Sequence, residues 1–211
     1  MIAALCVAVF ALVMVTGNAH AAPVGRATAD IENVKPGKGE TAWGRLVADA
    51  LRAQSGSDIA LVDAGSLNPG TLRAGEIERA NIEALLNFGT RDNAVVLTIT
   101  GAQLRAALEK AVQDYPTRSL SFLHGSGLTV RFGTGAAPRV GDVRISGRPV
   151  GNADQIKVAV PSSVANGAVF GGVWNGANNV PLNGTLTETI AAYISAQKTV
   201  APDTQVRIGE G

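Results

Sequence analysis

Few side chains in this sequence could carry out catalysis, and their types limit the chemistry. Beyond residue 21 there is one histidine, His124, and no cysteine, because His20 and Cys6 both come earlier. A two-metal phosphoesterase centre needs several histidine and carboxylate ligands around its ions. His124 and Ser126 are close in FLHGSGLTV, but this stretch lacks the G-x-S-x-G spacing of a nucleophile elbow and is better interpreted as a turn leading into a strand. We therefore expect no catalytic residues, no metal site and no cofactor in this chain.

Composition and charge argue against two classes of binding partner. The chain has 211 residues and a formal net charge of +1. Its charges are mixed along the sequence, with no basic stripe and no interleaving of basic and aromatic residues of the kind that binds nucleic acid. We expect neither nucleic acid nor an anionic membrane surface as a partner.

The first residues indicate export. Residues 1–15 are almost wholly apolar, the first charged side chain is Arg26, and Ala19-His20-Ala21 fits the small-x-small pattern of a signal-peptidase site. The sequence predicts a removable signal peptide over residues 1–21, no membrane attachment after its removal, and a periplasmic or secreted protein. Residues 22–39 are rich in Gly, Pro and charge, which predicts an irregular lead-in, and residues 40–211 are expected to form one domain.

Periodicity places the elements of that domain. An apolar stripe at helical spacing begins at Trp43, and capping boxes at Thr100 with Gln103 and at Thr185 with Glu188 predict two further helices. A short helical turn is expected at residues 81–86. Strands are predicted at residues 58–62, 94–100, 128–132, 143–145 and 156–160. Helices alternate with strands first and strands follow one another later, so we predict an α+β fold, a mixed sheet flanked by helices.

Several stretches together point to a known family: TAWGRLVADAL, SDIALVDAG, LRAGEI, NFG and LTITGAQLRAALE. From Glu40 to the last helix the sequence resembles the C-terminal, substrate-specificity domain of the secreted 5′-nucleotidases. In that family the metal-dependent phosphoesterase chemistry lies in a separate N-terminal domain, which we do not expect in this chain. The resemblance implies the binding half of an enzyme of nucleotide catabolism.

The resemblance also implies where polar ligand contacts would lie. Arg45 occupies a position on the first helix that brings polar or basic side chains to the family's cleft. The next strand in the family ends in a motif close to Asn-Gly-Gly-Gly-Ile-Arg, whose Arg holds the substrate. Here that place reads Asp63-Ala64-Gly65-Ser66-Leu67-Asn68, so Asn68 replaces the Arg and Asp63 opens the motif. Arg73 could compensate for the lost Arg, although a solvated surface arginine is the favoured alternative.

The same resemblance implies two aromatic rings around a nucleoside base. Phe88, in Asn87-Phe88-Gly89, matches the family's Pro-Phe-Gly segment without its proline. Trp174 matches only loosely a Gly-Gly-Asp-Gly-aromatic motif, because Val173 stands where an acidic residue is expected. Trp174 either offers a stacking face or fills the core behind a loop.

Three functions remain open after this comparison. The chain is interpreted first as a binding or accessory module for a nucleoside-type ligand. It could instead complete a 5′-nucleotidase-type hydrolase in trans with a separate metallophosphoesterase chain. The third alternative is a structural relic whose cleft is filled.

Overall fold

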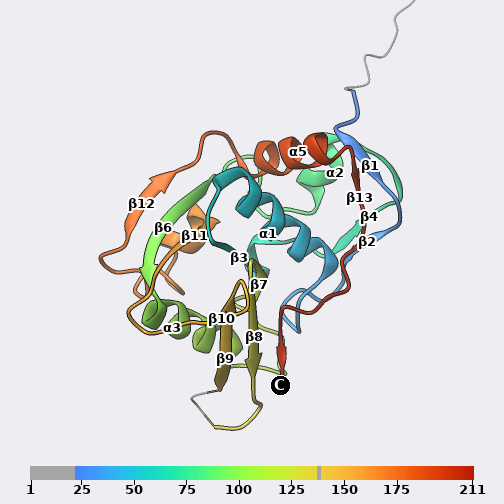
Figure 1. The fold of residues 1–211 in the computed structure, drawn as a ribbon. Coiled ribbons are helices and arrows are strands. Elements are labelled where there is room, and N and C mark those ends of the chain that lie inside the picture. The colour runs from blue at the N-terminus through green and yellow to red at the C-terminus, as the bar shows by residue number, and fades with distance from the viewer. Residues whose placement is uncertain (1–21, 137–138) are drawn as a thin grey trace, which may run out of the picture.

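A five-stranded mixed sheet forms the centre of the protein (Figure 1). The computed structural model describes residues 22–136 and 139–211, so the predicted signal peptide lies outside the described residues. The strand order is β12-β6-β11-β3-β7, with bounds Asn178–Pro181, Ala94–Thr100, Gln155–Pro161, Ile59–Asp63 and Leu123–Ser126. Strands β11 and β3 are parallel, and the other neighbours are antiparallel. The predicted α+β mixed sheet flanked by helices is confirmed.

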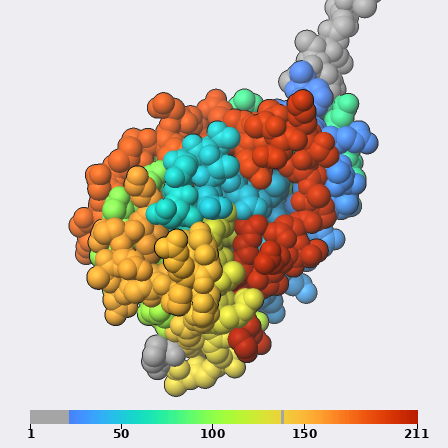
Figure 2. All heavy atoms as spheres, viewed as in Figure 1, coloured from blue at the N-terminus to red at the C-terminus, as the bar shows by residue number. Residues whose placement is uncertain are grey.

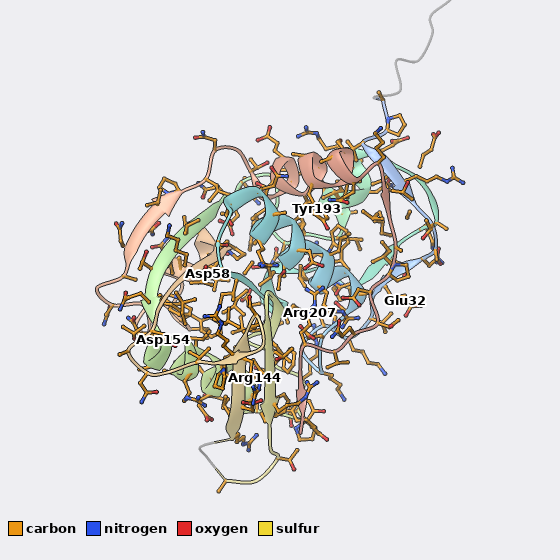
Figure 3. All side chains as sticks on the ribbon, viewed as in Figure 1. Glu32, Asp58, Arg144, Asp154, Tyr193 and Arg207 are labelled. Carbon is orange, nitrogen blue, oxygen red and sulfur yellow. The ribbon has the colours of Figure 1, made fainter. Side chains whose placement is uncertain are left out.

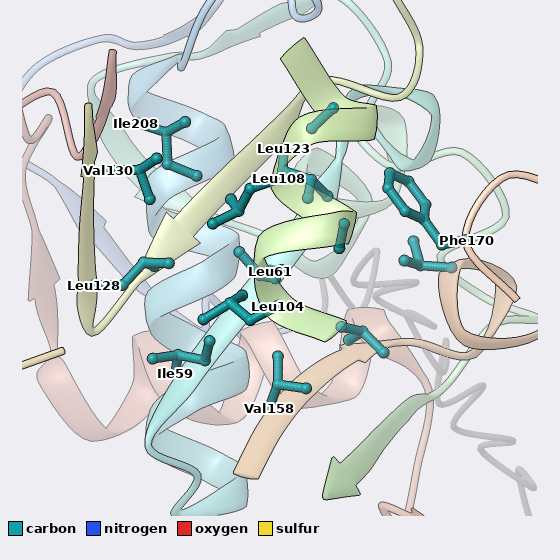
Figure 4. Packing of buried hydrophobic residues seen from close by; sticks show 14 of the residues in the cluster. Ile59, Leu61, Leu104, Leu108, Leu123, Leu128, Val130, Val158, Phe170 and Ile208 are labelled. Carbon is teal, nitrogen blue, oxygen red and sulfur yellow. The ribbon is translucent and has the colours of Figure 1, made fainter. Parts of the chain in front are cut away.

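Each face of this sheet has its own apolar core, because successive strand residues point to opposite sides. In β3, Ile59 and Leu61 face one core, and Ala60 and Val62 face the other. Figure 4 shows the first core, where the leucines of α3 pack over the strands. Helices α3 (Gly101–Val112) and α4 (Ser162–Asn166) cover this face, while α1 (Ala42–Ser55), α2 (Arg79–Ala84) and α5 (Leu186–Gln197) cover the opposite face.

The capping residues set where the main helices begin, as the sequence predicts. The Thr100 hydroxyl accepts from the Gln103 amide at 3.2 Å, and the Gln103 side chain accepts from the Thr100 amide at 2.8 Å. Thr185 and Glu188 make the same reciprocal pair at the start of α5. Both capping boxes therefore satisfy backbone amides that have no acceptor inside their helix.

Three smaller sheets complete the domain. One has the order β10-β9-β8-β14, from Arg148–Pro149, Val140–Ile145, Leu128–Phe132 and Ile208–Glu210. The second has the order β13-β1-β5, from Thr199–Val200, Gly25–Ala27 and Gly75–Ile77. The third pairs β2 (Ile31–Asn33) with β4 (Gly70–Leu72). Within residues 22–136 and 139–211, no helix is long and apolar enough to cross a bilayer.

The structure differs from the expected irregular lead-in over residues 22–39. Strands β1 and β2 lie in this stretch, and Ala27, Ile31 and Asn33 are buried. Each strand has only three residues and pairs with partners at least 37 positions away, such as Ile31 with Leu72. The local sequence carries no alternating pattern because tertiary pairing, rather than local propensity, makes these strands.

Candidate ligand-binding site

The loops that follow the two parallel strands meet at one edge of the main sheet. The 3₁₀ turn η1 (Ala64–Ser66) follows β3, and Ser162 follows β11 directly. Strand β6 runs the opposite way, with Ala94 paired to Pro161, so Asp92 lies at this same edge. Ligands bind open α/β sheets in the crevice outside the carboxyl ends of parallel strands. This edge is therefore the candidate site.

Two carboxylates shape the loops of this edge. Asp63 accepts from the Ser66 amide at 3.0 Å and from the Ser66 hydroxyl at 2.5 Å, which closes η1. Asp92 is buried and accepts from the Ser162 hydroxyl and from the Ser163 amide. Burial raises the pKa of Asp63 above its ordinary value; the bonds from Ser66 oppose this rise, and the charge of Asp92 adds a smaller increase. Both carboxylates thus hold backbone in place at the edge of the sheet.

Asn68, which the family resemblance places at the position of a substrate-holding Arg, is bonded to backbone. Its side-chain amide donates to the carbonyl oxygens of Leu86 at 3.0 Å and Ala84 at 3.3 Å. The backbone carbonyl oxygen of Asn68 accepts from the Asn33 side chain at 2.7 Å. The residue therefore ties the loop after β3 to the segment before Phe88, and its donors are already occupied.

Phe88 projects from the edge as an exposed ring. Its side chain is 55% exposed, and its backbone is held at a φ of 62°, in the left-handed region. The neighbouring Asn87 fixes this turn to η1, because its amide donates to Ser66 and its side chain donates to Gly65. The guanidinium carbon of Arg91 lies 5.5 Å from the ring centroid, a cation–π arrangement. Phe88 is thus a positioned aromatic surface with one neighbour already on it.

Trp174 adopts the core alternative. Its side chain is 5% exposed, and its ring stacks on Phe170 with centroids 6.2 Å apart. Gln103 at the start of α3 donates to the carbonyl oxygens on both sides of Trp174, which holds the loop down. Its indole N–H finds no acceptor within the described residues. Phe88 lies outside both cores and Trp174 inside one, so no open sandwich joins the two rings.

The two arginines of the predicted site point elsewhere. Arg45 is 5% exposed, donates to the backbone of Asp203 and lies 3.9 Å from Glu40, so its polar contacts are with the C-terminal segment and with Glu40. Arg73 is exposed and pairs with Asp30 at 2.7 Å. Arg73 is the solvated surface arginine of the favoured alternative. The structure therefore gathers Asp63, Asn68 and Phe88 at one edge. Arg45 and Arg73 are paired with Asp203 and Asp30, and Trp174 is packed in a core.

A buried polar chain that the sequence did not reveal leads inward from Asn68. Asn33 connects Asn68 to Thr41, whose hydroxyl donates to the Asn33 side chain at 2.7 Å, and the Thr41 amide donates to Nδ1 of His124 at 3.2 Å. Complete burial lowers the pKa of His124 to about 3, and the charge of Arg45 adds to this effect. Ser126 bonds to Asp49 instead, so His124 and Ser126 form no catalytic pair. Asn33 lies on β2, which offered no sequence signal.

Metal ligands are not grouped in the described part of the chain. Among residues 22–136 and 139–211, no cluster of three or more His, Cys, Asp or Glu side chains is placed to hold an ion. The groups at the candidate edge are two carboxylates that accept from backbone and hydroxyl groups, an exposed aromatic ring and a guanidinium.

Comparison with known proteins identifies the family. The sequence profile of the 5′-nucleotidase C-terminal domain matches residues 20–170. The chain belongs to this family. A search of curated proteins found no match to the sequence.

Solved structures share the fold at low sequence identity. A 5′-nucleotidase precursor from Thermus thermophilus superposes with a TM-score of 0.81 at 24% identity, covering 89% of this chain and 39% of that one. An NAD nucleotidase from Haemophilus influenzae gives 0.78 at 15% identity, with 90% and 38% covered. A sulfate thiohydrolase from Thermus thermophilus gives 0.68 at 18% identity, with 90% and 35% covered. The chain thus spans about two fifths of the length of these proteins, whose activities differ.

Proposed function

We propose that this 5′-nucleotidase C-terminal domain is a binding or accessory module that holds the ring of a nucleoside-type ligand against Phe88. The exposed Phe88 ring at the carboxyl edge of β3 is the observation that carries this proposal. Its turn is fixed to η1 by two bonds from Asn87, so the ring is positioned before any ligand arrives. Stacking a base on an aromatic side chain contributes about 1–3 kcal/mol.

The ligand's phosphate is proposed to add little. The family resemblance places Asn68 where a substrate-holding arginine is expected, and an arginine there would bind phosphate bidentately, whereas Asn68 is uncharged and its amide is bonded to backbone. Arg91, the cation beside Phe88, lies over the ring and competes for a ring face. Nucleosides are therefore expected to bind about as well as their monophosphates.

Calorimetric titration of adenosine, 5′-AMP and ribose 5-phosphate tests both statements. We expect adenosine and 5′-AMP to bind with similar affinity and ribose 5-phosphate not to bind. Phe88→Ala should weaken adenosine binding by about 5- to 150-fold, the equivalent of 1–3 kcal/mol, and Phe88→Tyr should preserve it. Absence of binding to wild type at millimolar ligand would favour a structural relic, and unchanged binding by a folded Phe88→Ala variant would refute the platform.

Catalysis, in this proposal, belongs to a metallophosphoesterase outside residues 22–211. The purified domain should not hydrolyse 5′-AMP with or without Mn²⁺ or Zn²⁺, because one histidine beyond residue 21 cannot supply a two-metal ligand set. The measurement is phosphate release by protein purified to constant specific activity. Metal-dependent release that persists and disappears in an Asp63→Asn or Asp92→Asn variant would contradict the proposal.

Export is proposed from the sequence of residues 1–21. Cleavage after Ala21 would leave Ala22 as the first residue, in an exported protein of the periplasm or the medium. N-terminal sequencing of the protein from the native cell envelope and medium tests this, and an intact Met1 would refute it.

A further inference from the structure

Residues 201–207, named here the strap, cross the surface between two short strands. The strap joins β13 to β14, and its flanking residues Val200 and Ile208 are both buried. No side chain between them is fully buried, and Val206 is 48% exposed. Figure 2 shows these C-terminal residues, in the darkest red, lying on the surface beside α1. The strap therefore has apolar anchors at its two ends and none along its length.

One hollow lies on each side of the strap. One, of about 330 Å³, is lined by Glu32 and Arg45 together with Pro202 and Thr204 of the strap. The other, of about 170 Å³, is lined by Asp49, Tyr193 and residues of the strap's first half. Both hollows share Ala42 and Asp203 as lining residues. Figure 3 shows Glu32 and Tyr193 on opposite sides of the strap, which forms the wall between the hollows.

Charges hold the strap down. The Arg207 guanidinium donates to both Asp49 carboxylate oxygens, at 2.7 and 2.9 Å, and to Asp203 at 2.7 Å. The backbone amides of Arg207 and Ile208 both donate to the Glu40 carboxylate, at 2.6 and 3.0 Å. The Asp203 carboxylate also lies 4.0 Å from Nε of Arg45, a buried nitrogen with no hydrogen-bond partner within the described residues. Polar contacts thus replace the apolar packing that fixes the rest of the chain.

We propose that the strap is an electrostatically latched cover, and that its release joins the two hollows into one groove. Partly exposed ion pairs are screened by salt, since the Debye length falls from about 10 Å at 0.1 M to about 3 Å at 1 M. Segments with few buried apolar contacts open at lower free energy than the core. Lifting the strap moves the Asp203 carboxylate away from Nε of Arg45. The opened groove then presents Arg45, Asp49 and Tyr193 together, with charges of both signs.

Hydrogen–deuterium exchange of the full chain tests the latch. The reporters are the amides of Arg207 and Ile208, because both donate to the Glu40 carboxylate. Amides of the β6–β11 pairing serve as the internal reference. We expect exchange at the two reporters, relative to the reference, to rise about 3- to 30-fold between 0.05 M and 1 M NaCl.

Two matched variants each remove one carboxylate charge. Asp203→Asn removes the charge that faces Arg207 and Arg45, while its side-chain oxygen can still accept from the Gln205 amide. Asp142→Asn removes an exposed pair with Arg144 of the same 2.7 Å length on β9. Asp203→Asn should speed exchange at the reporters and reduce its salt dependence, and Asp142→Asn should do neither. Salt-independent exchange in wild type, or equal rates in Asp203→Asn and wild type, would overturn the latch.

Discussion

Replacing Gly44 by alanine should destabilise the protein, whereas replacing a helical glycine by alanine usually stabilises it. Gly44 lies in the first turn of α1, where alanine is normally favoured over glycine by about 1 kcal/mol. A β-carbon at Gly44, however, would lie 2.2 Å from Nδ1 and 2.4 Å from Cγ of His124. The imidazole is fully buried and accepts from the Thr41 amide, so the ring cannot move without losing that bond.

These effects can be added for the Gly44→Ala variant. Overpacking a core site costs about 1–3 kcal/mol. Loss of the acceptor for the buried Thr41 amide costs about 1–3 kcal/mol more. After the helix-propensity gain of about 1 kcal/mol is subtracted, the variant should be destabilised by about 3 kcal/mol, within a range of about 1–5.

Urea unfolding followed by circular dichroism measures this difference. With a slope of about 2 kcal/mol per molar, the midpoint should fall by about 1.5 M. The matched test is Gly44→Ala in a His124→Ala background, where the ring is absent and the alanine should be neutral or stabilising by up to about 1 kcal/mol. If Gly44→Ala stabilises the wild-type protein, or destabilises both backgrounds equally, the proposed contact with His124 is wrong.

Two carboxylates give further predictions. Glu40→Gln should lower the free energy of unfolding by about 1–3 kcal/mol, because the new NH₂ group must face at least one of the three backbone amides that now donate to the carboxylate. The control is Glu76→Gln, at an exposed carboxylate, which should change the free energy of unfolding little. Burial raises the pKa of Asp63 in the folded protein above the ordinary value of 3.8. Just above pH 3.8 the folded protein therefore binds more protons than the unfolded chain, so the stability that Asp63 contributes falls as the pH rises from 3.8 through its folded-state pKa. Asp63→Asn, whose oxygen can still accept from Ser66, should therefore gain stability relative to wild type between pH 3 and pH 7. If the difference in free energy of unfolding between Asp63→Asn and wild type is the same at pH 3 and pH 7, burial does not raise the pKa of Asp63.

Local signals predicted the elements whose causes are local. Thr100 with Gln103 marked the start of α3 because both bonds of a capping box lie within four residues. Strands β1 and β2 escaped prediction because their pairing partners are distant in sequence. Arg45 was assigned to the cleft, yet its hydrogen-bond partner Asp203 is 158 residues away, and no pattern around Arg45 reports that contact.

The aromatic residues also show that sequence patterns do not report tertiary contacts. The sequence indicated that Phe88 and Trp174 were both candidates for stacking, but exposure depends on tertiary packing. Trp174 stacks on Phe170 in the core that α3 covers, whereas Asn87 holds the turn of Phe88 outside both cores. Arg91, three residues after Phe88, could have been suspected as its cationic neighbour from the spacing alone.

A crystal structure of the domain with adenosine tests the central claim most directly. We expect the base to stack on the Phe88 ring face that Arg91 leaves free, while Trp174 stays packed on Phe170. A base bound away from Phe88, or a Phe88 ring without ligand in crystals saturated with adenosine, would contradict it.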